Sequence, residues 1–569
     1  MKQFFPFLSW IQDYDRSMFS GDLSAGLTVG VMLIPQGMAY SMLAGLPPIY
    51  GLYASTIPLI IYALLGTSRQ LAVGPVAMVA LLIASGVGQL AELGTTEYIT
   101  LAILLALMVG LIQFSMGLFR LGFVVNFLAH PVIAGFTSAA ALIIGFSQLK
   151  HLLGLDIPRG KVHETLINVF QNIDQINVYT FAIGLAAIGI LIAIKKWARK
   201  LPGPLLVVVF GMATVYFLGL YDQDVKIVKN VPEGFPSFDL PSIDMGAIGT
   251  LMPIALTIAF VGFMESIAVA KAIQAKHKNY KLDANQELMA LGMANILGSF
   301  FKSFPVTGGF SRTAVNDQSG AKSGMASIIS ALVIILTLLF LTKYFYYLPT
   351  AVLAAIIMVA VFGLIDFKEA KHLWQVDKQD FLLFMITAIV TLVVGIEQGI
   401  LTGVALSILA LVYRTSYPHM AELGRIHDTD IFRNVNRFSE AIALPQTLIY
   451  RIDAPLFFGN INYIKDKIEA RIQNGEDVNK LVLHFGSVQR VDSSAIHAIL
   501  DLIEELKSSG VTIIFTDVIG PVRDIFAINK VVEKVGRENF FVTLKDAANY
   551  ISHQESNGDE AIVFQTGLN

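Results

Sequence analysis

The sequence predicts a polytopic α-helical membrane protein of fourteen segments, arranged as two inverted repeats of seven, followed by a small α/β domain. Three observations predict this fold class. Of the 569 residues, 55% are hydrophobic and 15% charged, whereas an average soluble protein has roughly 25% charged residues. The long apolar runs are concentrated in one region, between residues 22 and 415. Two short, interrupted apolar segments occupy matching positions in the halves of that region.

The first 22 residues mix charged and aromatic side chains without a cleavable signal peptide, which predicts an amphipathic lead-in at the lipid surface. The chain has no cysteine, so disulfides, thiol catalysis and cysteine-ligated metals are excluded. It contains no basic tract, no P-loop motif and no catalytic constellation outside the apolar region. We therefore expect no nucleic-acid partner, no cofactor, no metal and no enzymatic activity.

A spanning helix needs about 20 apolar residues, and a half-helix needs fewer. The first repeat, residues 23–220, is predicted to hold segments 23–44, 48–66, 75–89, 98–119, 123–149, 178–195 and 204–220. After a loop at 221–246, the second repeat, residues 247–415, is predicted to hold segments 247–271, 284–301, 310–318, 322–343, 348–366, 379–396 and 398–415. Segments 75–89 and 310–318 are too short or too broken to span.

The loops differ in positive charge. With the N-terminus inside, the inner loops hold more than twice as many Lys and Arg as the outer loops. Because cytoplasmic loops carry such an excess, we expect a multi-pass protein of the cytoplasmic membrane. Both termini would lie in the cytoplasm, and loop 221–246 would lie outside.

The segment from Ser303 to Asn316 interrupts the second repeat. Pro305 to Gly309 cannot continue a helix well, and helix-compatible residues resume afterwards. This pattern predicts an extended piece feeding the N-terminus of a half-helix, where free N–H groups and the helix dipole favour an anion. Arg312 would add a full positive charge, and Ser311 would most simply cap the half-helix.

The first repeat is interrupted at the matching place, from Leu71 to Ala77. This stretch has Gly74 and then Pro75, a residue typical of the first helical position. Because each repeat has an odd number of segments, the two copies are inverted, and a site near the membrane midplane between two facing half-helices is expected. The alternative is that these glycines and prolines only pack or kink helices.

Glu265 is the only acidic residue between Asp244 and Asp283. A charge in mid-membrane costs roughly 2.5–3.5 kcal/mol on insertion scales. We therefore interpret Glu265 as a proton-coupling carboxyl beside the anion seat, or else as the partner of Arg312 in a static ion pair. Sodium coupling is disfavoured, because the residues one turn away offer no side-chain oxygen.

Gln36 and Tyr40 are polar side chains in the first apolar segment. The Gln36 amide can donate to an anion, and Tyr40 lies one helical turn further on the same face. Both are candidate substrate contacts. The alternative is that they form structural hydrogen bonds where helices cross.

The run IPQGMAYSMLAGLPPIYGLY, from Ile34 to Tyr53, resembles the signature of the SulP sulfate-permease family, prokaryotic relatives of solute carrier family 26. Residues Asn285–Asn295 and Gly308–Asn316 are similar to its second signature. The resemblance spans the chain and implies a nucleobase-permease-like fold, a homodimer, and an elevator-like motion of a core domain against a gate domain. The site it implies comprises Gln36, Tyr40, the backbone at Val76 and Ala77, Glu265, Ser311 and Arg312.

Hydropathy drops after Arg414. We expect a linker at 416–440, an α/β domain at 441–555 and a flexible tail at 556–569. The stretch from Val488 to Ala495 resembles the strand-to-helix turn of STAS domains, whose stand-alone regulators are phosphorylated at the position of Ser493. Asp and Ser are also ordinary N-cap residues, so phosphorylation of Ser493 stays one of two interpretations. The partner of this domain is not identified.

The leading functional prediction is secondary active transport of a small inorganic anion, namely proton-coupled sulfate uptake. The alternatives are a sodium-coupled bicarbonate transporter, an uncoupled channel or exchanger for chloride or dicarboxylate, and a non-transporting sensor serving the C-terminal domain. Because members of the resembled family carry several anions, the substrate does not follow from the fold.

Overall fold

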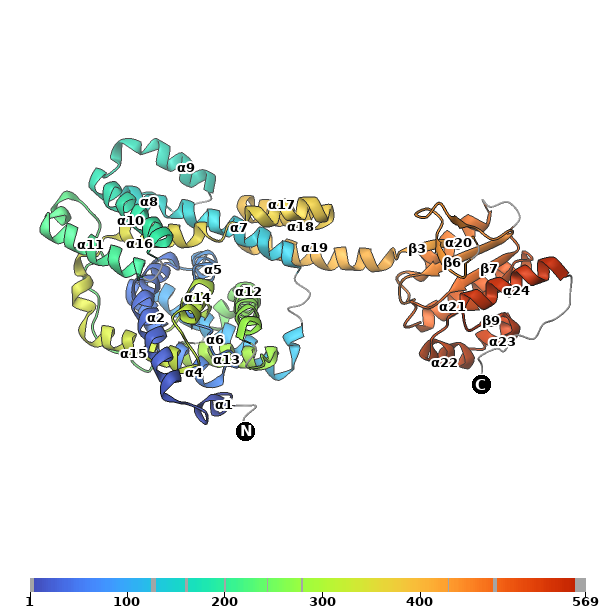
Figure 1. The fold of residues 1–569 in the computed structure, drawn as a ribbon. Coiled ribbons are helices and arrows are strands. Elements are labelled where there is room, and N and C mark those ends of the chain that lie inside the picture. The colour runs from blue at the N-terminus through green and yellow to red at the C-terminus, as the bar shows by residue number, and fades with distance from the viewer. Residues whose placement is uncertain are drawn as a thin grey trace. The chain divides into compact units, whose positions relative to one another are not determined.

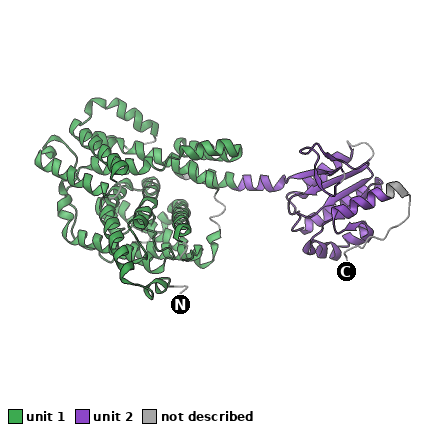
Figure 2. Ribbon diagram, viewed as in Figure 1, with its two compact units in different colours: residues 1–407 green, residues 408–569 purple. Residues whose placement is uncertain are grey.

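The computed structural model describes residues 5–557 except 124–128, 159–161, 199–200, 243, 278–279, 428 and 474–477. It divides into two compact units, residues 1–407 and 408–569 (Figure 2). The first unit is helical, and the second is an α/β domain (Figure 1).

The first repeat begins earlier than predicted. Its elements are α1 (Phe7–Ile11), α2 (Arg16–Leu43), α3 (Pro48–Tyr53), α4 (Ile57–Leu65), β1 (Val73–Gly74), α5 (Ala77–Val87), α6 (Thr96–Leu118), α7 (His130–Ser147), α8 (Leu149–Leu153), α9 (Val162–Gln171), α10 (Val178–Trp197) and α11 (Gly203–Phe217). The Asp15 carboxylate accepts a hydrogen bond from Met18 N at 2.7 Å. Because this N-cap satisfies a free amide of the first turn, α2 starts within the predicted lead-in.

The second repeat contains α12 (Met245–His277), α13 (Ala284–Ser299), β2 (Thr307–Gly308), α14 (Phe310–Gln318), α15 (Met325–Phe340), α16 (Thr350–Phe362), α17 (Phe367–Val376), α18 (Lys378–Val393) and α19 (Ile396–Ser416). Among the described residues, eight helices are long and apolar enough to cross a membrane, and α5, α11 and α15 are shorter apolar helices. The two interrupted segments are thus short strands followed by short helices.

Helices of one repeat pack on helices of the other: α6 on α13, α2 on α15 and α7 on α18. Glycines permit a close approach of these helices. A Cβ built on Gly110 of α6 would lie 2.7 Å from Ile296 N, and a Cβ on Gly292 of α13 would lie 2.5 Å from Phe114 N. Such small residues let helix backbones meet in a membrane, where the hydrophobic effect between helices is absent.

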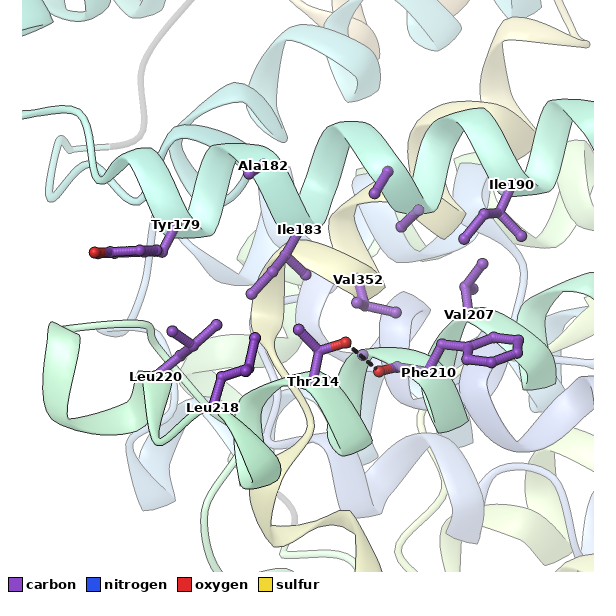
Figure 3. Close-up of a pocket in the computed structure, with 13 residues that line it drawn as sticks. Tyr179, Ala182, Ile183, Ile190, Val207, Phe210, Thr214, Leu218, Leu220 and Val352 are labelled. Atoms are coloured by element: carbon purple, nitrogen blue, oxygen red, sulfur yellow. Dashed lines mark hydrogen bonds between the residues drawn. The ribbon is translucent and has the colours of Figure 1, made fainter.

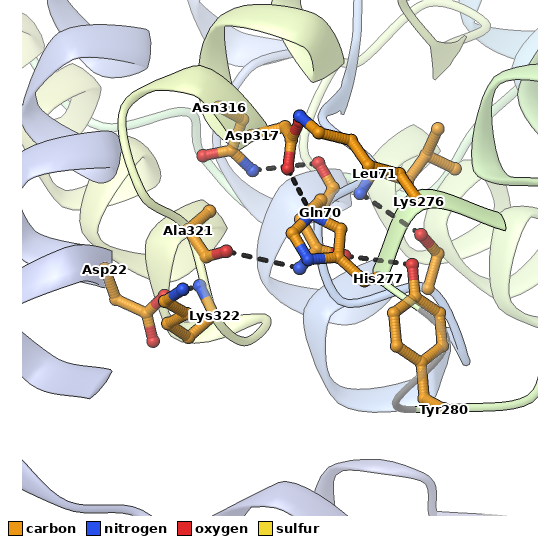
Figure 4. Close-up of polar contacts among 11 residues, drawn as sticks. Asp22, Gln70, Leu71, Lys276, His277, Tyr280, Asn316, Asp317, Ala321 and Lys322 are labelled. Carbon is orange, nitrogen blue, oxygen red and sulfur yellow. Dashed lines mark hydrogen bonds and ion pairs between the residues drawn. The ribbon is translucent and has the colours of Figure 1, made fainter. Parts of the chain in front are cut away.

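Buried polar contacts join the approach to β1 with the end of α14 (Figure 4). The Gln70 carbonyl accepts from Asn316 Nδ2 at 2.8 Å, and Gln70 Nε2 donates to the Ala321 carbonyl at 3.2 Å. The Tyr280 hydroxyl donates to Gln70 Oε1 at 2.9 Å. The two interrupted segments are therefore tied together on the side where α14 ends.

The second unit is a twisted sheet with helices. Its strands are β3 (Met420–Ile426), β4 (Phe432–Asn434), β5 (Ala441–Ile442), β6 (Thr447–Ile452), β7 (Lys480–His484), β8 (Thr512–Thr516) and β9 (Phe540–Phe541), in the order β4-β3-β6-β7-β8-β9 with β5 beside β3. Pairing is parallel from β6 to β9 and antiparallel around β3. The helices are α20 (Ile461–Gln473), α21 (Ser493–Ser508), α22 (Gly520–Ile528), α23 (Val531–Val535) and α24 (Leu544–Asn557).

The predicted linker at 416–440 is wrong, since it holds β3 and β4. Met420 pairs with Ile452 of β6, and Met420, Ala421 and Leu423 are buried. Apolar burial against a strand distant in sequence therefore places this stretch inside the domain. The predicted tail at 556–569 begins within α24, which ends at Asn557, and its part from 558 onward lies outside the described residues.

Candidate anion-binding site

The two interrupted segments meet. β1 and β2 pair antiparallel, with Val73 opposite Gly308 and Gly74 opposite Thr307. Gly309 N donates to the Ala72 carbonyl at 3.1 Å. Because α5 and α14 begin within three residues of this pair, the N-termini of the two half-helices are held close together by backbone hydrogen bonds.

Both half-helices begin without a side-chain cap in the described part of the chain. The N-cap residues are Val76 for α5 and Gly309 for α14, each in extended backbone. The prediction that Ser311 caps α14 is wrong: Gly309 occupies the cap position, so Ser311 falls inside the first turn and is exposed. The amides of Ala77 and its successors, and those at the start of α14, are thus left to a ligand or water.

Arg312 is buried between these two ends, with a relative exposure of 1%. Its Nη1 donates to the Pro75 carbonyl, while within the described residues Nε and Nη2 have no hydrogen-bond partner. A buried cation with unmade hydrogen bonds is costly. Two unpaired donors in one buried guanidinium therefore indicate a place for a negatively charged guest.

Glycines make room for this guanidinium. A Cβ on Gly309 would lie 2.8 Å from Arg312 Nη2, and a Cβ on Gly74 would lie 3.4 Å from the same atom. Gly74 also has φ +150°, a conformation that residues with side chains rarely adopt. One glycine of β1, Gly74, and the N-cap glycine of α14, Gly309, thus let the arginine reach across the strand pair.

The remaining predicted residues with a side-chain role lie in α2 and α12. Gln36 and Tyr40 lie one turn apart in α2, each 4% exposed, and among the described contacts Gln36 Oε1 has no partner. Glu265 of α12 is half-buried and interacts electrostatically with Arg312 and Tyr40. Within the described structure Nε and Nη2 of Arg312 have no hydrogen-bond partner, so neither atom is bonded to the Glu265 carboxylate.

The residues that support the approach to β2 are not among those predicted from the sequence. Asn295 of α13, fully buried, accepts from Val306 N at 2.8 Å and donates to the Val306 carbonyl at 3.1 Å. It also donates to Gln113 Oε1 at 3.1 Å, and Gln113 Nε2 donates to the Ala259 carbonyl at 3.1 Å. The Asn295 side chain thus pairs with both backbone groups of Val306, as a neighbouring strand would. Asn295 is the one polar residue between Glu287 and Ser299 in the sequence, and an amide in such an apolar stretch is the signal that points to this role.

An apolar cavity of about 320 Å³ lies elsewhere, between α10, α11 and Val352 of α16 (Figure 3). Apolar side chains form most of its lining, and the Thr214 hydroxyl donates a hydrogen bond to the Phe210 carbonyl of its own helix at 2.8 Å. This cavity therefore offers no charged donor to an anion. In the described residues no group of three or more His, Asp or Glu side chains is placed to hold a metal ion.

In the second unit, Ser493 is exposed at the first position of α21. Asp492 caps this helix: its carboxylate accepts from Ala495 N at 2.8 Å and from Phe458 N at 3.0 Å. The N-terminus of α21 is consequently occupied by a side chain, unlike those of α5 and α14.

Comparisons with known proteins identify the family of this chain. The family model for the sulfate permease family matches residues 19–387, and the model for the STAS domain matches residues 439–547. The chain is 41% identical to sulfate transporter 4.1, chloroplastic, of Arabidopsis thaliana, over 95% of this chain and 82% of that protein. It is 33% identical to high affinity sulfate transporter 1 of Stylosanthes hamata, over 96% and 86%.

Among solved structures, the murine solute carrier 26 family member A9 anion transporter in the inward-facing state superposes with a TM-score of 0.89. Identity is 29%, and the match covers 97% of this chain and 94% of that chain. The predicted fold, a helical membrane part with paired seven-segment repeats and a C-terminal STAS domain, is confirmed. The chain belongs to the sulfate permease family and is a multi-pass membrane protein with a STAS domain.

Proposed function

We propose that this chain takes up sulfate together with protons, as a secondary active transporter. The observation that carries the proposal is the buried Arg312, whose Nε and Nη2 have no partner among the described residues, between two uncapped half-helix ends. A tetrahedral oxyanion would accept hydrogen bonds from both helix ends and from the guanidinium. Gln36, Tyr40 and Ser311 would complete the shell, together with the backbone at Val76 and Ala77.

Charge matching favours a doubly charged anion. Each helix N-terminus is equivalent to about +0.5 charge, so the two ends with Arg312 supply about +2. Ionised Glu265 lowers this sum to about +1, and protonated Glu265 restores it. Sulfate therefore binds best when Glu265 carries a proton, whereas a singly charged anion is better matched when it does not. This difference would couple proton and sulfate movement.

The transport cycle would be elevator-like. α12 and α14 carry the proton and anion sites, and hydrogen bonds through β2 join them to one another and to β1. Such a tied group can move as a body against the remaining helices. We place the protein in the cytoplasmic membrane as a homodimer with both termini inside, and we leave the STAS partner open.

Uptake into proteoliposomes tests this function. Labelled sulfate and labelled bicarbonate are supplied in turn, while the pH gradient and the sodium gradient are varied separately. Sulfate accumulation driven by an inward proton gradient is the expected result. Bicarbonate uptake driven by sodium would favour that rival. Saturable exchange without accumulation would indicate an exchanger. A current that does not saturate would indicate a channel, and the absence of any flux would indicate a sensor.

The variant Glu265→Gln mimics the protonated carboxyl permanently. Sulfate binding should persist at every pH, since the seat keeps its full positive charge. Proton-driven accumulation should be lost, because no proton is picked up or released. Counterflow exchange of labelled for unlabelled sulfate provides the matched readout. If Glu265→Gln still accumulates sulfate against its gradient when driven by pH, Glu265 is not the coupling group.

A further inference from the structure

Side chains of α12 hold the strand that feeds α14, directly beside Glu265. The Gly308 amide donates to Ser266 Oγ at 2.8 Å, and the hydroxyl oxygens of Ser266 and Thr307 lie 2.7 Å apart. Thr307 Oγ1 in turn donates to the Gly262 carbonyl of α12. Ser266 and Thr307 are 0% and 1% exposed, so water does not compete for these bonds.

The direction of this chain of hydrogen bonds is fixed. A hydroxyl has one hydrogen to donate, and that of Thr307 goes to the Gly262 carbonyl. Ser266 must therefore donate to Thr307, while its oxygen accepts from Gly308 N. The chain runs from the strand amide through two hydroxyls to the helix carbonyl, and bonds aligned in this way strengthen one another in a low-dielectric interior.

The packing around the hydroxyls is equally tight. A Cβ on Gly308 would lie 2.9 Å from Ser266 Oγ, and a Cβ on Gly262 would lie 3.2 Å from Thr307 Oγ1. Helix and strand therefore touch through a glycine on each side. No spacer is available that would let β2 slide along α12 while the hydroxyls stay bonded.

We propose that Ser266 and Thr307 are positioning residues that fix the distance between the Glu265 carboxyl and the anion seat at the start of α14. Ser266 follows Glu265 in the chain, and Gly308 precedes the N-cap Gly309. The link thus joins the neighbour of the proton site to the neighbour of the anion site. The interaction energy of two charges falls with their separation. The link therefore determines how much protonation of Glu265 changes the affinity for the anion. This inference rests on the proposed function.

Thr307→Val tests the link, because it keeps the side-chain shape and removes the hydroxyl. The measurement is the KM for labelled sulfate in proteoliposomes at a series of external pH values. We expect the KM at acid pH to rise about tenfold, the effect of leaving a buried donor unsatisfied, and its pH dependence to flatten. Thr307→Ser restores the hydroxyl and should restore both. Ser266→Ala breaks the same link from α12 and should reproduce the flattening.

Ser330→Ala is the matched control. Ser330 of α15 is also buried, at 1% exposure, and its hydroxyl donates to the Gly26 carbonyl at 2.9 Å, away from β2. This variant loses a comparable buried bond and should keep the wild-type pH profile. If Thr307→Val and Ser266→Ala also keep it, and lower only the number of active molecules, the hydroxyls are merely structural and the inference is wrong.

Equilibrium binding of labelled sulfate to the full chain distinguishes failure of the positioning role from failure of the proposed function. If the wild type binds sulfate and Thr307→Val binds it equally at every pH, the positioning role is refuted while the proposed function stands. If the wild type itself binds no sulfate at any pH, the proposed function is refuted and the positioning role with it.

Discussion

The two half-helices share a backbone plan but differ in chemistry. Each follows a two-residue strand and starts without a side-chain cap in the described structure. α5 is built from apolar and small residues, and most of its side chains are buried. α14 buries Arg312, Thr313, Asn316 and Asp317, and Thr313 and Asn316 reach back to the backbone of the other copy, at Ala72 N and the Gln70 carbonyl. The first repeat supplies an uncapped helix end, α5. The second repeat supplies another, α14, together with the positive charge of Arg312 and the hydrogen bonds that join the two segments.

Arg312→Ala should have the largest effect. It removes half of the positive charge of the seat and two unpartnered charged donors, each worth about 1.5–3 kcal/mol when bonded. We expect saturable sulfate uptake to fall at least about a hundredfold, with Arg312→Lys intermediate because lysine lacks the forked donors. Initial rates in proteoliposomes measure the loss, and membrane insertion of the variant is the control. Undiminished uptake would remove Arg312 from the site.

A carboxylate at the start of α5 should have the next largest effect. Val76→Asp would cap the free amides and place a negative charge where the anion binds. We expect the KM for sulfate to rise more than about tenfold, although helix stability improves. Val76→Thr, which caps without charge and keeps the branched shape, is the control and should raise the KM less. Equal KM values for the wild type and Val76→Asp would show that α5 does not face the anion.

Gly309→Ala should have a smaller effect. The new Cβ would lie 2.8 Å from Arg312 Nη2, the far end of a flexible side chain, so the guanidinium shifts and the backbone stays. We expect a several-fold higher KM with unchanged thermal stability. Gly292→Ala is the opposite case: its Cβ meets backbone, Phe114 N at 2.5 Å, so stability falls and the KM of the surviving protein is unchanged. Equal behaviour of the two variants would contradict this distinction.

The site could be predicted from the sequence as far as local chemistry decides it. Pro305, the Gly-Gly pair and Arg312 predict an interrupted helix that carries a positive charge. Glu265 is identified as a candidate because it is an acidic residue in an apolar segment. What could not be predicted depends on tertiary partners. Ser266 and Thr307 look like ordinary membrane-helix and turn residues until β2 is placed against α12.

The same limit explains the errors outside the site. Residues 420–434 carry no strong strand pattern, and pairing with β6 joins β3 to the parallel part of the sheet. Ser311 has the composition of a cap but the wrong position, since the backbone of Gly309 sets where α14 begins. Propensity identifies candidates for such roles, and the register of the chain selects among them.

Asp492→Ala should have the smallest effect and completes the comparison, because α21 is a capped helix where α5 and α14 are open. Removing the cap frees the amides of Ala495 and Phe458 and should cost about 1 kcal/mol. Hydrogen exchange in the full chain should then be faster for the first turn of α21, while the sulfate KM stays that of the wild type. Ser493→Ala removes the proposed phosphorylation site but keeps the cap, so it should leave this exchange unchanged. A KM that changes in Asp492→Ala alone would mean that the fold of the α21 N-terminus affects transport. A KM that changes in both variants would mean that Ser493 itself affects transport.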